Sequence, residues 1–177
     1  MYPYETAATK PPIPEPWLRG TLTEVSAVPR AVLHALELAD EDLKQWCGAL
    51  TDAELHARPA NLPSIAFHLR HIARSLDRLL SYAEGHSLAQ EQLAALKEEM
   101  HSKATRETLF AELSAAFTHS AERVRALATI ALEQPRKVGK KALPTTVGGL
   151  LVHVADHTQR HVGQALTTAK IILAQRT

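Results

Sequence analysis

Four long stretches of the sequence repeat apolar residues at the spacing of a helix, and they restrict what the chain can fold into. These stretches cover residues 29–50, 64–85, 105–130 and 145–174. In each, apolar side chains recur three or four residues apart, which places them on one face of a helix. Alanine and leucine dominate the apolar content, only 5% of the residues are aromatic, and no segment is a strong candidate for a strand. We therefore predict an all-α fold.

Capping residues and turn residues mark where the elements begin and end. Ser64 is placed to cap the second long helix, and capping-box spacing occurs at Thr51 and at Ser87. The first box predicts a single short helical turn, and the second predicts a short helix that ends near residue 100. Residues 135–144 contain two prolines, one glycine and four basic residues, so we predict a loop there.

Four long helices with short connections are most economically packed as a four-helix bundle, with the short extra helix between the second and third long ones. Residues 1–20 contain five prolines. We expect this segment to run extended across the folded body, with Trp17 and Leu18 as its first anchors. Residues 21–177 contain no repeat and no visible boundary, so we expect them to form one domain.

Charge and cysteine content narrow the classes of partner and compartment. The formal net charge is +1 and no basic block stands out, which argues against binding to nucleic acid or to a membrane surface. The single cysteine, Cys47, suits a reducing compartment and lies among apolar residues, so we predict a packing role. Without an apolar leader or a spanning segment, the expectation is a cytoplasmic bacterial protein. We expect a small-molecule substrate and a homodimer formed through helix faces.

The last predicted helix carries a run of histidines that is the main indication of function. His153, His157 and His161 stand at i, i+4 and i+8, on one flank of a helix. With ten histidines in 177 residues, a single His-x3-His pair arises by chance roughly half the time, but a run of three arises in only about 3% of shuffled chains. Neutral imidazole is a common metal ligand, and an i, i+4 pair lets one helix supply two ligands to one ion.

Helical-wheel geometry separates these histidines. At 100° per residue, the apolar arc of the last helix is centred nearer to His157 and His161 than to His153. We therefore predict an inward pair and treat His153 as an outer neighbour. On the second helix, the wheel puts His68 nearer the apolar stripe than His71, so the pattern alone does not select His71 as a third ligand.

Two motifs give the chain a family resemblance. The stretches PSIAFHLRHIARS (63–75) and HVADHTQRHVGQ (153–164) resemble the DinB/YfiT-like family of metal-dependent proteins. In that family, the first metal-binding histidine lies seven residues after a helix-opening serine, and the other two form a His-x3-His pair before a Gly-Gln-like dipeptide. The resemblance therefore implies that His71, His157 and His161 are the metal ligands. The family often has glutamate after the first histidine of the pair, where this chain has Thr158.

The resemblance also implies a chemistry. It predicts a four-helix bundle with a divalent ion held by three histidines, zinc or nickel foremost and iron or manganese as alternatives, with an open position for water or substrate. Members with known roles are mostly transferases and isomerases that use a low-molecular-weight thiol. The residues expected behind the ligands or in the cleft are His68, His153, Arg160 and Gln164. No general acid or base is assigned.

Two other functions stay open at the level of sequence. The first is a non-catalytic module for metal binding or sensing, which a fourth protein ligand such as His68 or His153 would favour. The second is a metal-dependent hydrolase, which needs a carboxylate base near the ion. Asp156, the nearest acidic residue in the sequence, is poorly placed for that role.

Overall fold

The computed structural model describes residues 13–99 and 103–176, and this part of the chain is mostly helical, as predicted. Its elements, in chain order, are η1 (Pro16–Leu18), α1 (Ala27–Cys47), α2 (Asp52–His56), η2 (Pro59–Asn61), α3 (Ile65–Glu84), α4 (Gln90–Glu98), α5 (Arg106–Leu127), β1 (Pro135–Val138), β2 (Leu143–Thr146) and α6 (Val147–Ala174).

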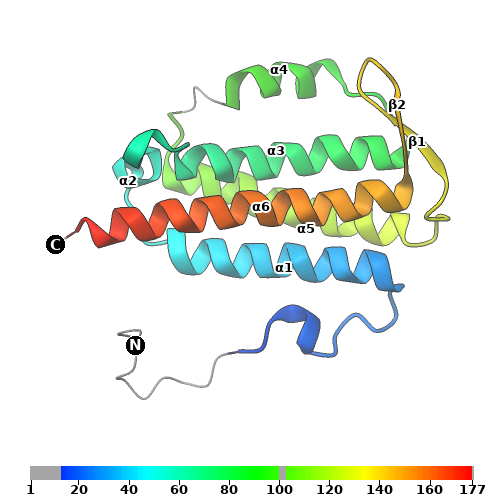
Figure 1. Ribbon diagram of the computed structural model, residues 1–177, viewed down its shortest axis with the longest axis horizontal. Coiled ribbons are helices and arrows are strands. Elements are labelled where there is room, and N and C mark those ends of the chain that lie inside the picture. The colour runs from blue at the N-terminus through cyan, green and yellow to red at the C-terminus, as the bar shows by residue number, and fades with distance from the viewer. Residues whose placement is uncertain (1–12, 100–102, 177) are drawn as a thin grey trace.

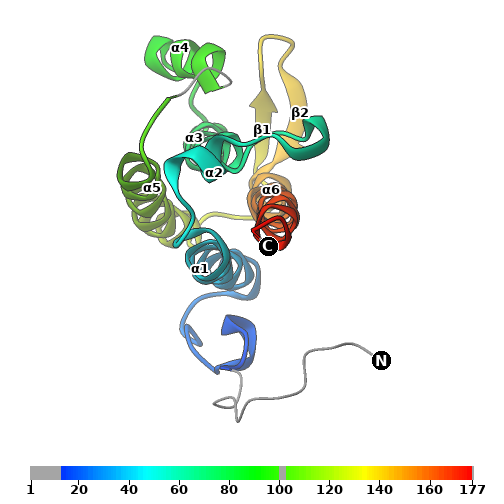
Figure 2. The same cartoon turned by 90° about the vertical axis from the view of Figure 1, so that its left-hand side faces the viewer.

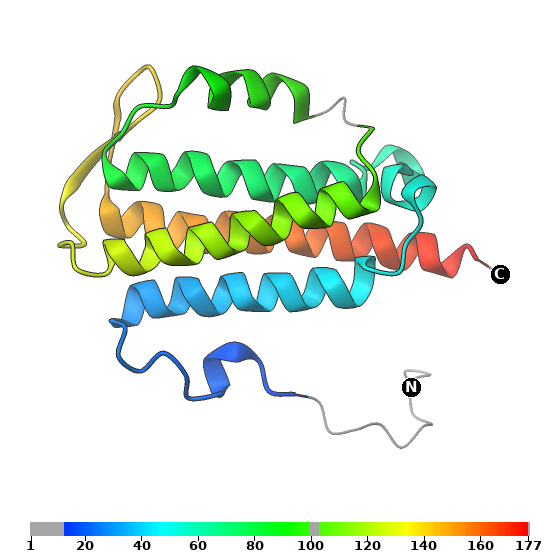
Figure 3. The ribbon, with the colours of Figure 1, turned by 180° about the vertical axis from the view of Figure 1, so that it is seen from behind.

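The four long helices lie side by side, and each contacts two others. Helix α1 packs against α5 and α6, and α3 packs against the same two from the other side (Figure 2). Helices α1 and α6 run in one direction, whereas α3 and α5 run in the opposite one (Figures 1 and 3). The short helix α4 lies outside this group, along α3 (Figure 1). The adjacent antiparallel pair α3 and α6 carries the histidines of interest.

The core lies between the four long helices and is almost entirely aliphatic. Removing one such side chain from water contributes about 1.5–3 kcal/mol, which explains why the apolar stripes determine how the helices pack. The largest side chains that are essentially unexposed include Leu43, Leu50, Leu69, Ile72, Leu76, Leu80, Leu109, Leu113, Leu127 and Leu151.

Cys47 at the end of α1 is part of this core, as predicted. Its exposed fraction is 0%, and burial raises the pKa of its thiol to about 12. We expect 5,5′-dithiobis(2-nitrobenzoate) to leave Cys47 unmodified in the native protein, because the reagent needs an accessible thiolate. In strong denaturant the same assay should report one thiol per chain. Modification of the native protein within minutes would contradict a packing role.

Most of the predicted helix starts are confirmed by their caps. The hydroxyls of Ser64, Thr105 and Thr146 each accept a hydrogen bond from the backbone N–H three residues later, at 3.2, 3.3 and 3.1 Å. Such a bond satisfies one of the unpaired donors at a helix start. Thr51 and Glu54 form the predicted capping box at α2. These caps fix where α3 and α6 begin, and hence how far along each helix its histidines stand.

The capping box predicted at Ser87 is wrong. Helix α4 begins at Gln90, with Ala89 at the cap position. Ala89 has no side-chain oxygen, and only the returning half of the box exists, in which the side chain of Gln92 accepts from the Ala89 N–H at 2.8 Å. The amide of Gln92 also donates to Asp77 on α3 at 2.6 Å, so a long-range contact decides where this helix starts. Its predicted end near residue 100 lies outside the described residues.

The proline-rich segment also differs from the prediction where it is described. Residues Pro16–Leu18 form a 3₁₀ turn, and Trp17 and Leu18 are 61% and 57% exposed, so they are not anchors. The segment is held instead by Arg19, which donates to two glutamates of α1 at 2.6–2.8 Å. The rest of the proline-rich segment, residues 1–12, lies outside the described residues.

The loop predicted at residues 135–144 is a β-hairpin. Strands β1 and β2 pair antiparallel, from Pro135 opposite Thr146 to Val138 opposite Leu143. Neither strand alternates apolar and polar residues, so the sequence contained no strand pattern to detect. The hairpin is held to the body through Arg136, which donates to the carbonyl of Ala83 at 2.6 Å. It thereby fastens the start of α6 to the end of α3.

Candidate metal centre

Helices α3 and α6 bring together three imidazole rings that are far apart in the sequence. His71 comes from α3, and His157 and His161 come from successive turns of α6. Each offers one ring nitrogen, and these three nitrogens all lie within 4.8 Å of one another. The distances between ring centroids are 5.1, 4.3 and 4.7 Å for the three pairs. This group of donors, drawn from the described residues, could hold a metal ion.

The hydrogen bonds of His71 determine which nitrogen faces the cluster. Its Nδ1 lies 2.7 Å from Oε2 of Glu99. A carboxylate accepts, so Nδ1 carries a proton, and in the neutral ring Nε2 keeps its lone pair. That Nε2 lies 3.4 Å from Nε2 of His157. Two nitrogens bound tetrahedrally to one zinc ion would be about 3.3–3.4 Å apart, so these two rings fit such an ion.

Glu99 is a functional candidate that the sequence analysis missed. It lies just beyond α4 and is only 4% exposed. Its second oxygen accepts from Arg78 at 2.5 Å. Burial raises the pKa of the Glu99 carboxyl, but the hydrogen bonds from His71 and Arg78 outweigh burial and hold this pKa below its usual range. A carboxylate in this position fixes the orientation of a ligand histidine and increases its basicity.

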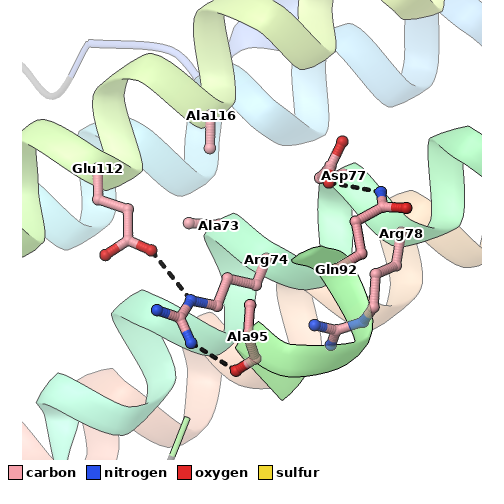
Figure 4. Close-up of a pocket in the computed structure, with 8 residues that line it drawn as sticks. All are labelled: Ala73, Arg74, Asp77, Arg78, Gln92, Ala95, Glu112 and Ala116. Atoms are coloured by element: carbon pink, nitrogen blue, oxygen red, sulfur yellow. Dashed lines mark hydrogen bonds and ion pairs between the residues drawn. The ribbon is translucent and has the colours of Figure 1, made fainter. Parts of the chain in front are cut away.

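Polar contacts hold α4, the helix that leads to Glu99, against α3. No residue from 90 to 97 is buried, and Leu96 is 46% exposed. Arg74 of α3 donates to the carbonyl of Ala95 at 2.6 Å and to Glu112 of α5 at 3.1 Å (Figure 4). A small cavity of about 130 Å³ remains between the three helices. Glu99 is therefore the point where this weakly packed helix meets the histidine cluster.

His68 lies behind the cluster, next to His161. It is 1% exposed, as the helical wheel predicted, and its Nδ1 is 3.0 Å from Nδ1 of His161. When His161 binds through Nε2, its Nδ1 holds the proton and donates to His68. Each of two candidate ligands, His71 and His161, then has its own hydrogen-bond partner.

The other residues singled out by sequence are not among the clustered donors. The side chain of His153 is 45% exposed and its Nδ1 lies 3.7 Å from Asp156, while its ring meets the ring of His157 edge-on, with 5.4 Å between centroids. Arg160 is also exposed and donates to Asp156 at 2.6 Å. Gln164 is exposed and lines a pocket with Arg160. Thr158, which stands where the family often has glutamate, is 1% exposed.

His157 and His161 are neutral at pH 7 before any ion binds. Burial, followed by the proximity of His161 and His71, lowers the pKa of His157 to about 4. Burial, followed by His71 and Arg160, lowers the pKa of His161 to about 4. The rings therefore offer lone pairs at pH 7. Nδ1 of His157 is buried and has no hydrogen-bond partner among the described residues. Phe67 covers one side, with its ring stacked on His71 at 5.3 Å.

These depressed pKa values predict a pH dependence of folding for the metal-free protein. His68, His157 and His161 titrate near pH 4 when folded, against an ordinary value of 6.5. The folded state binds fewer protons in this window, so we expect the free energy of unfolding to be highest above pH 6.5 and to fall as the pH drops towards 4. Urea denaturation of chelator-treated protein at several pH values measures it.

Carboxylates that are paired in the folded state are also protonated as the pH falls, and this too lowers the free energy of unfolding. A variant is therefore needed to isolate the contribution of the histidines. His68→Gln removes one group with a depressed pKa, and we expect its unfolding free energy to decline less between pH 6.5 and pH 4. A decline as steep as that of the parent protein would show that His68 does not contribute.

The chain was compared with protein families, curated proteins and solved structures. A family model described as the DinB superfamily matches residues 35–165, a range that includes all three clustered histidines and Glu99. No curated protein and no solved structure matches the chain. In the described part of the chain, no helix is long and apolar enough to cross a membrane.

Proposed function

Because the chain belongs to the DinB superfamily, we propose that it is a four-helix-bundle metalloenzyme that catalyses a thiol-dependent transfer or isomerisation. His71, His157 and His161 would hold a divalent ion, with zinc or nickel as the first candidates. The observation that supports this best is the convergence of three ring nitrogens within 4.8 Å, with the first ring fixed by a buried carboxylate. We further propose a small-molecule substrate and action in the cytoplasm.

A bound divalent ion would supply Lewis acidity, which lowers the pKa of a coordinated thiol and stabilises its thiolate at neutral pH. The residues of the chain orient the donors and set the charge. Glu99 keeps the proton of His71 on Nδ1, and His68 would accept a hydrogen bond from the Nδ1–H of His161. Since all three ligands would be neutral, the positive charge of the ion is not cancelled by its ligands, and this favours an anionic sulfur.

The geometry supports an open site over a closed one. The donor group contains three histidines and no fourth ligand from the described residues. His68 uses its Nδ1 to contact the back of His161, and His153 lies outside the cluster with its side chain 45% exposed. Three protein ligands and a free position are typical of catalytic sites, whereas closed four-ligand sites are typical of structural ones.

The same contacts weigh against a hydrolase. Asp156 is 52% exposed and pairs with Arg160, and both oxygens of Glu99 are engaged by His71 and Arg78. Neither carboxylate is free to deprotonate a water at the centre. The non-catalytic binding module is the alternative that the experiment below distinguishes.

The test is turnover by the metal-loaded protein with a panel of low-molecular-weight thiols. With 1-chloro-2,4-dinitrobenzene, the thiolate sulfur bonds to the ring carbon and chloride leaves, and the thioether is followed by its absorbance. We expect turnover with at least one thiol and none after chelation. Stoichiometric metal binding without turnover for any thiol and electrophile would instead support the binding module.

A further inference from the structure

A pocket of about 500 Å³ lies beside the histidine cluster, between α6 and the segment before α3. Its lining includes His68, which contacts the ligand candidate His161. It also includes Arg160, the residue directly before His161 in the sequence. Gly163 and Gln164 continue the lining along α6. The volume falls within the range of pockets that enclose small organic molecules. None of the three ligand candidates is among the described lining residues, and the pocket meets the proposed metal centre through His68, which contacts His161.

The opposite wall is made by Leu62 and Pro63, and the chain bends sharply to place them there. Ala60 and Asn61 both adopt left-handed backbone conformations, with φ values of 49° and 60°. For a residue such as alanine this conformation is strained, and such strain is found preferentially where a ligand is held. Leu62 remains 37% exposed, so the wall offers apolar surface to an occupant.

The floor of the pocket on α6 is kept clear by a glycine. A Cβ atom built on Gly163 would meet nothing within 4 Å, and its backbone is helical, so no conformational need accounts for glycine here. Any larger side chain at this position would take up space in the pocket.

The charged group and the hydrogen-bond donors that line the pocket indicate the sign of the charge on its ligand. Among the described residues that line the pocket, Arg160 is the one charged side chain. Its Nη2 donates to Asp156 at 2.6 Å. The other guanidinium N–H groups remain available to donate to a second anion. When His161 holds its proton on Nδ1, Nδ1 of His68 accepts that hydrogen bond at 3.0 Å, and a neutral His68 then carries its own proton on Nε2 and is also a donor. The pocket thus combines an apolar wall with donors and a cation.

We propose that this pocket binds a small organic anion, an aryl or alkyl carboxylate whose apolar body lies against Leu62 and Pro63 and whose carboxylate meets Arg160. The inference rests on the proposed function, since it assigns the pocket to the non-reacting part of the substrate. It names a substrate class for that reaction: compact molecules with an apolar body and a carboxylate, in place of amines or neutral polar molecules.

The test uses three matched probes, 4-phenylbutanoate, 4-phenylbutanamide and 4-phenylbutylamine, with the full-length protein. Binding is measured by saturation-transfer NMR and titration, in zinc-loaded and in chelator-treated samples. We expect the carboxylate to bind best and the amine worst in both samples. Gly163→Leu should weaken binding of the carboxylate at least tenfold. Arg160→Gln should remove the preference for carboxylate over amide and leave amide binding unchanged.

Controls separate the pocket from the metal and from misfolding. Ala174→Leu also introduces a leucine on α6, at an exposed position outside the pocket, and the affinity of this variant for the carboxylate should match that of the parent. Thr167→Leu, also in the lining, should repeat the effect of Gly163→Leu.

Unchanged affinity in both pocket variants, or equal affinity for carboxylate and amine, would overturn the proposal. A carboxylate preference seen only with zinc would place the anion on the metal and overturn the role of Arg160. Lack of zinc binding would refute the proposed function alone, because the chelated samples still test the pocket.

Discussion

Replacement of His157 by alanine should reduce the affinity for zinc by about two orders of magnitude or more. Structural sites with four ligands bind zinc with about 10–16 kcal/mol, or about 3 kcal/mol per ligand. His157 is one of the three described donors in the cluster, and neither His68, which contacts His161 through Nδ1, nor His153, whose side chain is 45% exposed, belongs to that donor group. Competition with a chromogenic chelator measures the change, and bound metal per chain after gel filtration gives the stoichiometry.

His153→Ala is the matched control, since the two histidines are one turn apart on the same helix. The side chain of His153 is 45% exposed, and its removal should leave zinc affinity and stoichiometry unchanged. In the metal-free state, His157→Ala should change the free energy of unfolding by no more than about 1–2 kcal/mol, because Nδ1 of His157 has no hydrogen-bond partner among the described residues and its Nε2 has only the long 3.4 Å contact with His71. Full zinc occupancy in His157→Ala would rule out the three-histidine site.

The second large effect should follow from Glu99→Gln. The buried carboxylate neutralises Arg78, whose side chain is 11% exposed, and accepts from His71. Removing one charge of a buried pair leaves the other uncompensated, so we expect the free energy of unfolding to fall by about 2–4 kcal/mol. Zinc affinity should fall by about 10- to 100-fold, as it does when the carboxylate behind a ligand histidine is removed. Urea denaturation and chelator competition measure the two effects.

Glu112→Gln controls for the loss of a carboxylate that does not contact the cluster. Glu112 pairs with Arg70 and Arg74, and its side chain is 30% exposed. We expect a smaller loss of stability and unchanged zinc affinity. If Glu99→Gln lowered stability but left zinc affinity as in the parent protein, Glu99 would be a structural residue that plays no part in holding the ligand.

Local signals in the sequence were sufficient to predict the helices but not the structure of the segments that connect them. Ser64, Thr105 and Thr146 cap their helices through bonds to backbone three residues away, and such contacts can be inferred from a short window of sequence. The hairpin at 135–146 has no apolar alternation, and Arg136 holds it through a carbonyl 53 residues away. The start of α4 depends on Gln92 bonding to α3, which no local pattern encodes.

Some features of the histidine site likewise follow from local sequence, and others depend on contacts between distant residues. The spacing of His157 and His161 follows from one helix, and the wheel placed His68 inside and His153 outside, as the structure shows. The choice of His71 came from a resemblance, because the wheel alone favoured His68; the structure places the ring of His71 with the pair and His68 behind His161. Glu99 was missed because its contact with His71 joins residues 28 positions apart, and a single glutamate in a charged helix carries no signal.

Because the hairpin fastens the start of α6 to the end of α3, the number of residues between this junction and each histidine matters as much as the identity of those residues. His71 stands 14 residues before Gly85 at the end of α3, and His161 stands 14 residues after Val147 at the start of α6. Both are about 21 Å along their helices from the same junction. One residue inserted between Val147 and His157 would turn both histidines by about 100° and displace them by about 1.5 Å. We therefore expect an insertion or deletion in this interval to disassemble the site, whereas a substitution at an exposed position such as Val152 would leave the spacing intact.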